Sequence, residues 1–384
     1  MDDDEHLDEA TVADTDDADE LGGAAAADHD AGYTPVPDDL EPRGADDGAV
    51  LPALPWLDPA PSLGRLATHP RAARIAGAVL GAAIGDALGH PTEFLSLDAI
   101  RAKWPPDGVT GYALFWERDG RRFAPYTDDT QMAEVVLRAL LWSRHENAEL
   151  DATMQEMARG FVHWSKHPQG GHRSPGNACM SGCRALADGA HWTQAGGPSA
   201  GGCGSVMRAY PFGLLFHDDL ERAERWAVAH SRLTHGDPIA LAACAAMAVG
   251  MGRALRDDPP VMVLSEMVAA ACRYSPRTAA MMAEAIDDAL RDVEPSVTLS
   301  RLEAWAAHEA IAAACYLFAR NPNDFPAAVL EGANTPGDSD SIATLAGALL
   351  GARLGVAAIP ADWIEQLERT DVFQRLAWAA ALPS

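Results

Sequence analysis

The sequence predicts an all-α protein, and three observations carry that prediction. Apolar and small residues recur at spacings of three and four along most of the chain from Arg71 onward, as on one face of a helix. The segments between these stretches contain Pro, Gly and Asp, which are typical of loops. Strand-like alternation is almost absent, and its best candidate is 112–116. We therefore expect a compact, single-domain, orthogonal helical bundle without an evident repeat.

Nine segments follow the helical spacing closely enough to be given boundaries. In chain order they are 71–89, 129–144, 151–166, 176–189, 218–230, 238–255, 278–292, 299–319 and 342–355. The first and the last carry glycine at every fourth position, as Gly77, Gly81, Gly85 and Gly89, and as Gly347, Gly351 and Gly355. Glycine costs a helix about 1 kcal/mol relative to alanine. We therefore expect each stripe to allow the close approach of a neighbouring backbone.

Negative charge is concentrated at the start of the chain. The net charge is −27, and residues 1–50 contribute −17 of it, because they hold 18 acidic residues against Arg43 alone. A segment with so few large apolar residues cannot bury enough surface to offset chain entropy. We predict a disordered acidic N-terminal extension at residues 1–65 and one folded domain at residues 66–384. The extension is either a solvated tail or an arm that docks on a basic protein partner.

Composition also argues against several classes of protein. No segment has the features of a signal peptide, and Arg353 interrupts the longest apolar run near the C-terminus, so we expect no membrane partner. The acidic balance argues against nucleic acid as the main partner. The six cysteines lack zinc-type pairing and lie mostly in apolar helical patterns, which predicts reduced thiols and a cytoplasmic location.

Two acidic clusters carry the strongest chemical signal. Residues 127–130 read Thr-Asp-Asp-Thr, residues 338–341 read Asp-Ser-Asp-Ser, and each cluster runs into a helical segment. One acid is enough to cap a helix, whereas two acids with hydroxyls exceed that need. Crowded carboxylates require a cation or a titrating partner, and an all-oxygen set suits magnesium or manganese better than zinc or copper. The clusters form one hard-cation site if they meet in space, and otherwise they are two independent caps.

Three further segments are candidates for a functional site. Residues 85–93 (GDALGHPTE) end a helix and present Glu93 on a loop, where a solvated acid is the simpler interpretation. Residues 196–205 form a glycine-rich loop whose backbone N–H groups suit a phosphate, although no Gly-Lys-Ser/Thr follows as in a P-loop. Residues 230–238 contain His235, which either faces a ligand or is a hydrogen-bonded structural histidine.

Taken in order, the five segments resemble those of the ADP-ribosylglycohydrolase family, which includes dinitrogenase reductase-activating glycohydrolase. The matching stretches span about residues 71–358 and read GAVLGAAIGDALGHPTEF, YTDDTQM, GGCGSVMR, SRLTHGDP and GDSDSIATLAG. The resemblance implies an all-α domain with two Mg²⁺ or Mn²⁺ ions in a central cleft. It also implies hydrolysis of the bond between ADP-ribose and an acceptor, often an arginine of a protein, which would reverse ADP-ribosylation.

The resemblance also implies a role for each residue that matches a family motif. The metal ligands would be Thr127, Asp128, Asp129, Asp338, Asp340 and Ser341. The catalytic residues would be Glu93, as a mobile loop acid near the scissile bond, with Asp128 and Asp129. The substrate would be bound by Gly202, Cys203, Gly204 and Ser205 at the diphosphate, and by His235 at the distal ribose or phosphate.

The chain departs from the family pattern at three places. Ser341 stands where threonine is common and keeps a coordinating hydroxyl, whereas Cys203 stands where asparagine is common and removes an amide contact to the substrate. Residues 172–177 lack an acid that some relatives carry, which leaves the acceptor open. Two alternatives follow: a hydrolase of serine, nucleic-acid-base or small-molecule conjugates, and an antidote-type protein whose acidic arm blocks an ADP-ribosyltransferase toxin.

Overall fold

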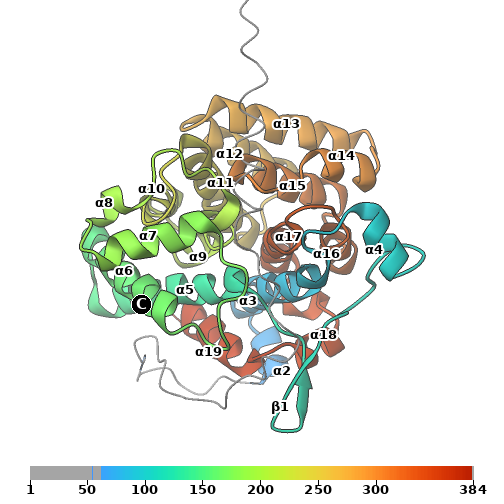
Figure 1. Ribbon diagram of the computed structural model, residues 1–384, viewed down its shortest axis with the longest axis horizontal. Coiled ribbons are helices and arrows are strands. Elements are labelled where there is room, and N and C mark those ends of the chain that lie inside the picture. Colours follow the sequence, from blue (N-terminus) through green and yellow to red (C-terminus); the bar gives the residue numbers. More distant parts are fainter. Residues whose placement is uncertain (1–53, 55–61, 383–384) are drawn as a thin grey trace, which may run out of the picture. The chain divides into compact units, whose positions relative to one another are not determined.

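The structure is a computed structural model that describes Leu54 and residues 62–382. Over these residues the chain is mostly helical and contains one two-stranded sheet, so the all-α prediction is confirmed (Figure 1). The acidic extension predicted for residues 1–65 lies outside the described residues, apart from Leu54 and the last four positions, and its boundary stays a prediction.

The helices are numerous, and the α-helices range from four residues in α8 to 20 in α3. In chain order they are α2 (Leu63–Ala67), α3 (Pro70–Gly89), η1 (His90–Thr92), α4 (Leu97–Lys103), β1 (Trp116–Arg118), β2 (Arg121–Phe123), α5 (Asp128–Glu146), α6 (Leu150–Lys166), α7 (Asn177–Ala187), α8 (Trp192–Ala195), η2 (Cys203–Ser205), α9 (Tyr210–Leu215), α10 (Leu220–Ser231), α11 (Pro238–Leu255), α12 (Pro260–Cys272), α13 (Pro276–Leu290), α14 (Pro295–Arg301), α15 (Ala307–Arg320), α16 (Phe325–Ala333), α17 (Ser339–Leu354), η3 (Val356–Ala358), α18 (Ala361–Gln366) and α19 (Thr370–Ala381).

Helices α3 and α17 pack against each other in the core, and Figure 1 shows them side by side. A Cβ atom added at Gly81 would come within 3.0 Å of the backbone of Gly347, and one added at Gly351 would do the same at Gly77. Real Cβ atoms do not approach other atoms that closely, so only glycine permits this contact. The packing role predicted for the two glycine stripes is confirmed. Because the backbones touch, the loops at the ends of both helices are held in place.

Most predicted helices are present, and the exceptions have a local cause. Helix α11 matches 238–255, with the Asp237 carboxylate accepting the Ile239 N–H over 2.9 Å. The single helix predicted at 299–319 is wrong, because the chain turns between α14 and α15, where Ala304 has φ 65°. The backbone freed by this turn pairs with the glycine loop, through the bridge between Gly202 and Ala306.

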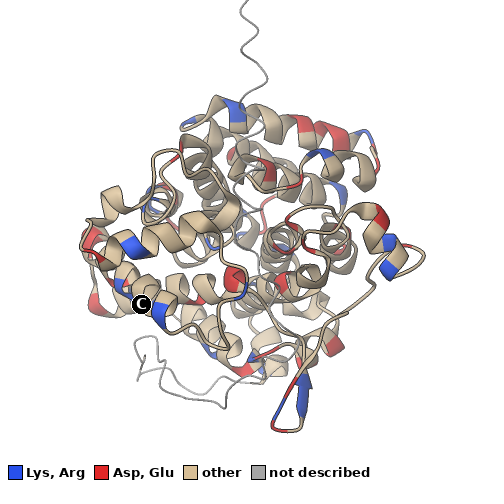
Figure 2. Ribbon diagram, viewed as in Figure 1, with Lys and Arg blue, Asp and Glu red and all other residues tan. Residues whose placement is uncertain are grey.

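The strand predicted at 112–116 lies later in the sequence than expected, because β1 begins at Trp116. Strands β1 and β2 form an antiparallel hairpin in which Trp116 lies opposite Phe123. This hairpin carries Arg118, Arg121 and Arg122, and it is mostly blue in Figure 2. It is the one sheet among the described residues.

Two helical segments are long and apolar enough to cross a membrane, at Pro70–Thr92 and Pro238–Leu255. In the structure, 89% of an apolar 18-residue stretch of the first segment and 83% of that of the second are buried. Core helices pass the same test of length and composition, so the two segments are weak support for a membrane span.

Candidate functional site

The two acidic clusters lie together in space, at the starts of α5 and α17. The Ser341 hydroxyl of the second cluster donates a hydrogen bond of 2.9 Å to Asp129 Oδ2 of the first. Thr127 is the N-cap of α5 and Asp338 is the N-cap of α17. Each of the six side chains predicted as metal ligands is at most 5% exposed. The structure therefore joins the clusters in one buried site.

Asp86 of α3 fixes the first cluster in position. Its carboxylate accepts the backbone N–H groups of Thr127 (2.8 Å) and Thr130 (3.0 Å) and the Thr130 hydroxyl (2.6 Å). Burial, followed by the charge of Asp340, raises the pKa of Asp86 to about 7. The sequence analysis gave Asp86 no role. The available signal was a lone acid on an otherwise apolar, glycine-striped helix, because such an acid needs partners when it is buried.

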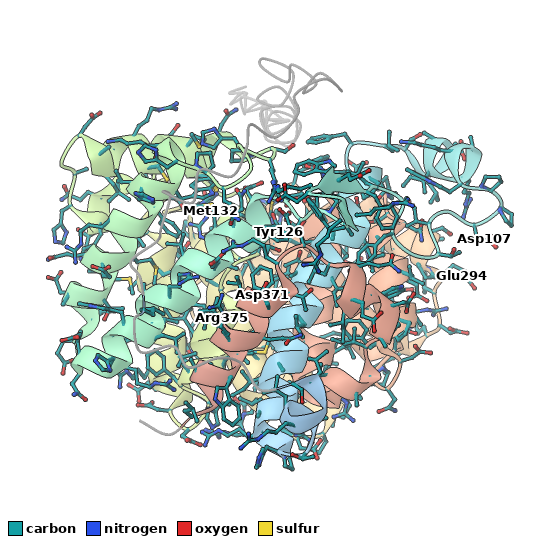
Figure 3. The ribbon with its side chains drawn as sticks, turned by 90° about the horizontal axis from the view of Figure 1, so that it is seen from below. Asp107, Tyr126, Met132, Glu294, Asp371 and Arg375 are labelled. Carbon is teal, nitrogen blue, oxygen red and sulfur yellow. The ribbon has the colours of Figure 1, made fainter. Side chains whose placement is uncertain are left out.

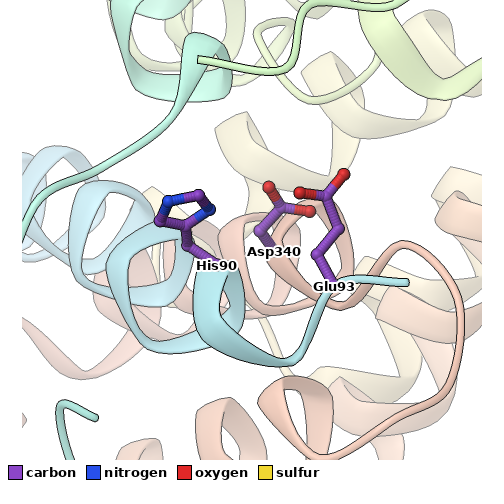
Figure 4. Close-up of side chains that lie close together, drawn as sticks. All are labelled: His90, Glu93 and Asp340. Atoms are coloured by element: carbon purple, nitrogen blue, oxygen red, sulfur yellow. The ribbon is translucent and has the colours of Figure 1, made fainter. Parts of the chain in front are cut away.

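Glu93 lies on the turn after η1 and faces the start of α17. A ring nitrogen of His90 and carboxylate oxygens of Glu93 and Asp340 lie within 4.8 Å of one another (Figure 4). The turn is held on both sides, because the Thr92 hydroxyl donates to the Ala333 carbonyl (2.6 Å) and the Phe94 N–H donates to the Gly337 carbonyl (3.1 Å) in the loop before α17. Burial, and then the charge of Asp340, raises the pKa of Glu93 well above its usual value. Glu93 is therefore partly buried beside Asp340, and its assignment as a catalytic residue stays a prediction.

His90 was not predicted as a site residue. Its Nδ1 atom is buried and has no hydrogen-bond partner among the described residues. Burial, and then the charge of Arg173, lowers the pKa of His90 to about 4, so the ring is neutral near pH 7. A neutral imidazole beside two carboxylates is a donor that a divalent ion accepts. His90 therefore brings a ring nitrogen beside the carboxylate oxygens of Glu93 and Asp340, and the all-oxygen donor set stays a prediction.

The acids of the site differ from other buried acids in their partners. Burial acts to raise the pKa of Glu134, but Arg369 and Arg138 hold it below its usual value. Burial raises the pKa values of Asp128 and Asp129 far above the usual range, and the charge of Asp340 raises them further. Within the described part of the chain, neither of these two aspartates forms an ion pair. The site thus concentrates more negative charge than the protein offsets, which fits the binding of cations.

The glycine loop meets the second cluster at Cys203. Its Sγ atom lies 2.6 Å from Asp338 Oδ2 and 3.8 Å from Ser341 Oγ. Gly202 and Gly204, on either side, are partly exposed, so their backbone groups remain accessible to a ligand. The predicted diphosphate loop therefore adjoins the predicted metal ligands.

Ser205 differs from Gly202, Cys203 and Gly204 of the glycine loop, because its side chain is turned into the protein. It is fully buried, and its hydroxyl accepts hydrogen bonds from the Ser231 hydroxyl (2.9 Å) and the Cys244 thiol (3.4 Å). Its side chain is therefore used inside the protein, and its predicted contact with the substrate stays a prediction.

His235 and Arg208 are buried side chains that lie against the glycine loop. His235 is 2% exposed, its Nδ1 lies 2.7 Å from Thr234 Oγ1, and burial followed by the charge of Arg208 lowers its pKa to about 3. Arg208 is fully buried and donates to the Gly204 carbonyl and to Thr234 Oγ1 (2.6 Å). It therefore ties the loop to the segment 230–238. Arg208 ends the GGCGSVMR stretch, but it was not predicted as a site residue.

The basic stretch at 172–177 is partly internal. Arg173 is 5% exposed, and its guanidinium donates to Glu368 (2.7 Å) and to the Tyr126 carbonyl (2.6 Å). The Arg173 carbonyl accepts the Asp128 N–H over 3.3 Å. Tyr126, labelled in Figure 3, directly precedes the first acidic cluster. The Arg173 guanidinium therefore holds the loop before the first acidic cluster. It is not available to contact the acceptor group of a substrate.

The all-α fold, with its buried acidic site beside a glycine loop, matches a family of glycosyl hydrolases. The model of the ADP-ribosylglycohydrolase family matches residues 67–383, and the chain belongs to that family. A solved structure titled "ADP-ribosylglycohydrolase-related protein complex" has a TM-score of 0.60 and 25% identity, covering 81% of this chain and 98% of that chain.

Several curated relatives act on ADP-ribosyl groups by their names. "ADP-ribosylarginine hydrolase Tri1" of Pseudomonas putida is 28% identical over 313 residues, which covers 79% of this chain and 76% of the relative. "ADP-ribosyl-[dinitrogen reductase] glycohydrolase" of Rhodospirillum rubrum is 26% identical, covering 77% and 90%. "ADP-ribosylhydrolase ARH3" of Homo sapiens is 26% identical, covering 78% and 91%. Family and relatives together make this chain an ADP-ribosyl hydrolase.

Proposed function

We propose that this enzyme hydrolyses the glycosidic bond between ADP-ribose and an arginine side chain of a modified protein, in a reaction that requires two Mg²⁺ or Mn²⁺ ions. The observation that carries the proposal is the convergence of the α5 and α17 acids with Glu93, where no arginine of the described residues forms an ion pair with them. The ADP-ribosylated protein is then the substrate partner. We place the reaction in the cytoplasm, because all six cysteines are free thiols.

The side chains that would hold the ions share oxygen donors and burial, and they are Thr127, Asp128, Asp129, Asp338, Asp340 and Ser341. When bound, the ions supply Lewis acidity at the ribose and a bound water of lowered pKa. Asp86 keeps the first three donors in position through its hydrogen bonds to Thr127 and Thr130.

The protein's own groups handle the substrate and the proton. Glu93 contacts neither cluster through a short hydrogen bond, yet its carboxylate lies within 4.8 Å of Asp340, a separation that one water or one ribose hydroxyl spans. Glu93, or an aspartate of the first cluster, therefore moves the proton between water and the leaving group. The partly exposed backbone of Gly202 and Gly204 binds the diphosphate, and buried Arg208 keeps that loop rigid.

Charge favours arginine as the acceptor. An arginine-linked substrate brings a guanidinium, which carboxylates bind in a planar, two-point arrangement. The acids around Glu93 exceed the cations that the protein supplies there, so a cationic leaving group is stabilised in this site. The printed names of the Pseudomonas putida and Rhodospirillum rubrum relatives support an ADP-ribosyl-protein substrate.

Release of free ADP-ribose from defined conjugates tests the proposal. The enzyme is treated with a chelator and then offered arginine-, serine- and nucleic-acid-linked ADP-ribose, with Mg²⁺ or Mn²⁺ added back. We expect release from the arginine conjugate only after a metal is restored. Equal release with chelator present would overturn the metal requirement, and preference for another conjugate would overturn the acceptor.

A further inference from the structure

A cleft lies between α6, α7 and α8, apart from the acidic site. These three helices contact one another and lie together on the left in Figure 1. The cleft has a volume of about 650 Å³. Ligand-binding clefts in proteins commonly measure about 300–1,000 Å³. None of the residues described above for the acidic site or the glycine loop lines it, so the cleft is a separate place for a small ligand.

Helix α6 gives the cleft a cationic wall. The residues of α6 that line it share one face of the helix, and the basic ones are Arg159, His163, Lys166 and His167. Lys166 is exposed and forms no ion pair with another residue of the described part of the chain. The Nε2 atom of His163 is buried and has no hydrogen-bond partner among those residues. Arg159 differs, because its Nε donates to Glu156 over 2.9 Å. The wall therefore carries positive charge and a ring nitrogen that the protein leaves unsatisfied.

The opposite wall is apolar and aromatic. Leu186 and Ala187 of α7 line it, together with Trp192 at the start of α8. The Trp192 ring is fixed in place, because its Nε1 donates to Asp151 Oδ1 over 2.8 Å. Trp192 is partly exposed, and an indole held in this way offers a surface on which a planar ring stacks.

The charge of the cleft is one-sided. No aspartate or glutamate lines it, although the chain carries a net charge of −27. A cavity of about 470 Å³ between α10, α11 and α12 shows the contrary pattern. There, Arg253 pairs with Glu266 over 3.4 Å. Arg273 likewise pairs with Glu224. Unbalanced positive charge attracts an anion and repels a metal ion, so the cleft at α6 is suited to an anionic ligand.

We propose that the cleft between α6, α7 and α8 binds an organic phosphate that carries a planar ring, with a nucleoside diphosphate as the simplest example. Lys166 and the imidazoles of the α6 wall bind the phosphate groups, and the Trp192 ring stacks on the base. One such ligand uses both walls, whereas inorganic phosphate or a nucleoside uses one. The inference goes beyond the proposed function, because it needs neither metal ions nor hydrolysis.

Acetylation of lysine locates the bound ligand, because the chain contains two lysines, Lys103 and Lys166. Chelator-treated full-length protein is treated with acetic anhydride in the presence of ADP, and peptide mass spectrometry measures the rate at each lysine. With ADP at about ten times its Kd, acetylation of Lys166 should slow by about tenfold. Parallel reactions contain adenosine or inorganic phosphate at the same concentration, and we expect weaker protection from each.

Lys103 is the matched control within the same molecule. Like Lys166 it is exposed, and its Nζ lies 4.4 Å from the centroid of the Trp104 ring, but it lies outside the cleft. ADP should leave its acetylation rate unchanged. Equal slowing at both lysines, or none at Lys166, would overturn the proposal. Equal protection of Lys166 by inorganic phosphate and ADP would overturn the role of the planar ring.

Calorimetric titration with ADP tests the two walls separately. Lys166→Ala removes a charged partner of the phosphate and Trp192→Leu removes the stacking surface, so each should weaken binding by about tenfold. Lys103→Ala should bind ADP as the wild type does, and circular dichroism checks that each variant is folded. Unchanged affinity in folded Lys166→Ala and Trp192→Leu would contradict the assignment.

Hydrolysis keeps this site distinct from the proposed active site. Lys166→Ala should release ADP-ribose from conjugates at the rate of the wild type. ADP that binds at the glycine loop alone would leave Lys166 unprotected, which would overturn the cleft and leave the proposed function in place. Protection of Lys166 in a protein that hydrolyses no conjugate would overturn the proposed function and leave the cleft in place.

Discussion

Asp128 and Asp340 each lie in the first turn of a long helix, where the helix dipole favours negative charge. That effect is worth about 0.3–1 kcal/mol at an exposed helix end. It does not balance several carboxylates in one buried volume. These residues are therefore poorly suited to stability and well suited to binding cations, which separates them from arginine-paired acids such as Glu134.

Replacing either aspartate with asparagine should lower activity without harming the fold. We expect Asp128→Asn and Asp340→Asn each to reduce kcat/KM by about 10²-fold or more, because each removes a donor to the catalytic ions. Each also removes a repulsive charge, so the melting temperature of the chelated protein should stay level or rise. Asp107→Asn is the control, since Asp107 is exposed and lies at the edge of Figure 3, away from Tyr126. Full activity in the double variant would contradict the metal model.

Replacing Glu93 with glutamine tests proton transfer separately from metal binding. Glu93→Gln should lower kcat by about 10²–10⁴-fold, the usual contribution of a general acid or base. Binding of Mn²⁺, measured by calorimetry, should weaken far less than kcat falls. A parallel loss of Mn²⁺ affinity would instead make Glu93 a ligand.

At the scale of elements, the fixed relation of α3 to α17 determines where both clusters lie. A Cβ at Gly89 would come within 3.0 Å of Asp340, so the end of one helix touches a predicted ligand on the other. The close contact that makes the core is thus continuous with the site.

Gly351→Ala should destabilise the protein through this contact. Its methyl group would overlap the backbone of Gly77, and overpacking of a core typically costs about 1–3 kcal/mol. Gly64→Ala in α2 is the control, because nothing lies within 4 Å of the added Cβ. Its effect should be neutral or a gain of up to about 1 kcal/mol. Urea unfolding measures both variants, and equal free energies of unfolding would refute the packing argument.

The local sequence patterns predicted which segments are helical better than they predicted which distant segments those helices contact. The glycine stripes predicted a close backbone neighbour but did not identify it. The break at Ala304 was missed, and the segment after it pairs with the glycine loop, a distant contact that the local pattern does not reveal. Asp86 and His90 were missed because their roles depend on the starts of α5 and α17, which are far away in the sequence.

For the whole molecule, the site couples stability to pH. The pKa of Asp86 is about 7 in the folded chain and 3.8 as its ordinary value, and the pKa values of Asp128 and Asp129 are also raised. These acids therefore bind more protons in the folded, metal-free protein than in the unfolded chain over this range. Their contribution to the free energy of unfolding falls as pH rises from about 4 to about 7.

Metal should reverse that loss. The rise in melting temperature on adding Mn²⁺ to chelated protein should be larger above pH 7 than below pH 5, because cations replace the protons. Other groups titrate equally with and without metal, so the difference isolates the site. In the double variant with Asp128→Asn and Asp340→Asn, the rise in melting temperature on adding Mn²⁺ should depend less on pH. An equal gain at both pH values would contradict the charge argument.

The hydrogen bond from the Ser339 hydroxyl to the Gly89 carbonyl joins positions 250 residues apart. At about 5–20 residues per second of synthesis, α3 precedes its partner by roughly 10–50 s. During that time the small-residue face of a nascent α3 lacks the helix that covers it. A prematurely terminated chain that ends before α17 would have neither the core contact nor half of the acids. Activity therefore requires synthesis to have passed α17, and shorter chains depend on chaperones or proteases for their fate.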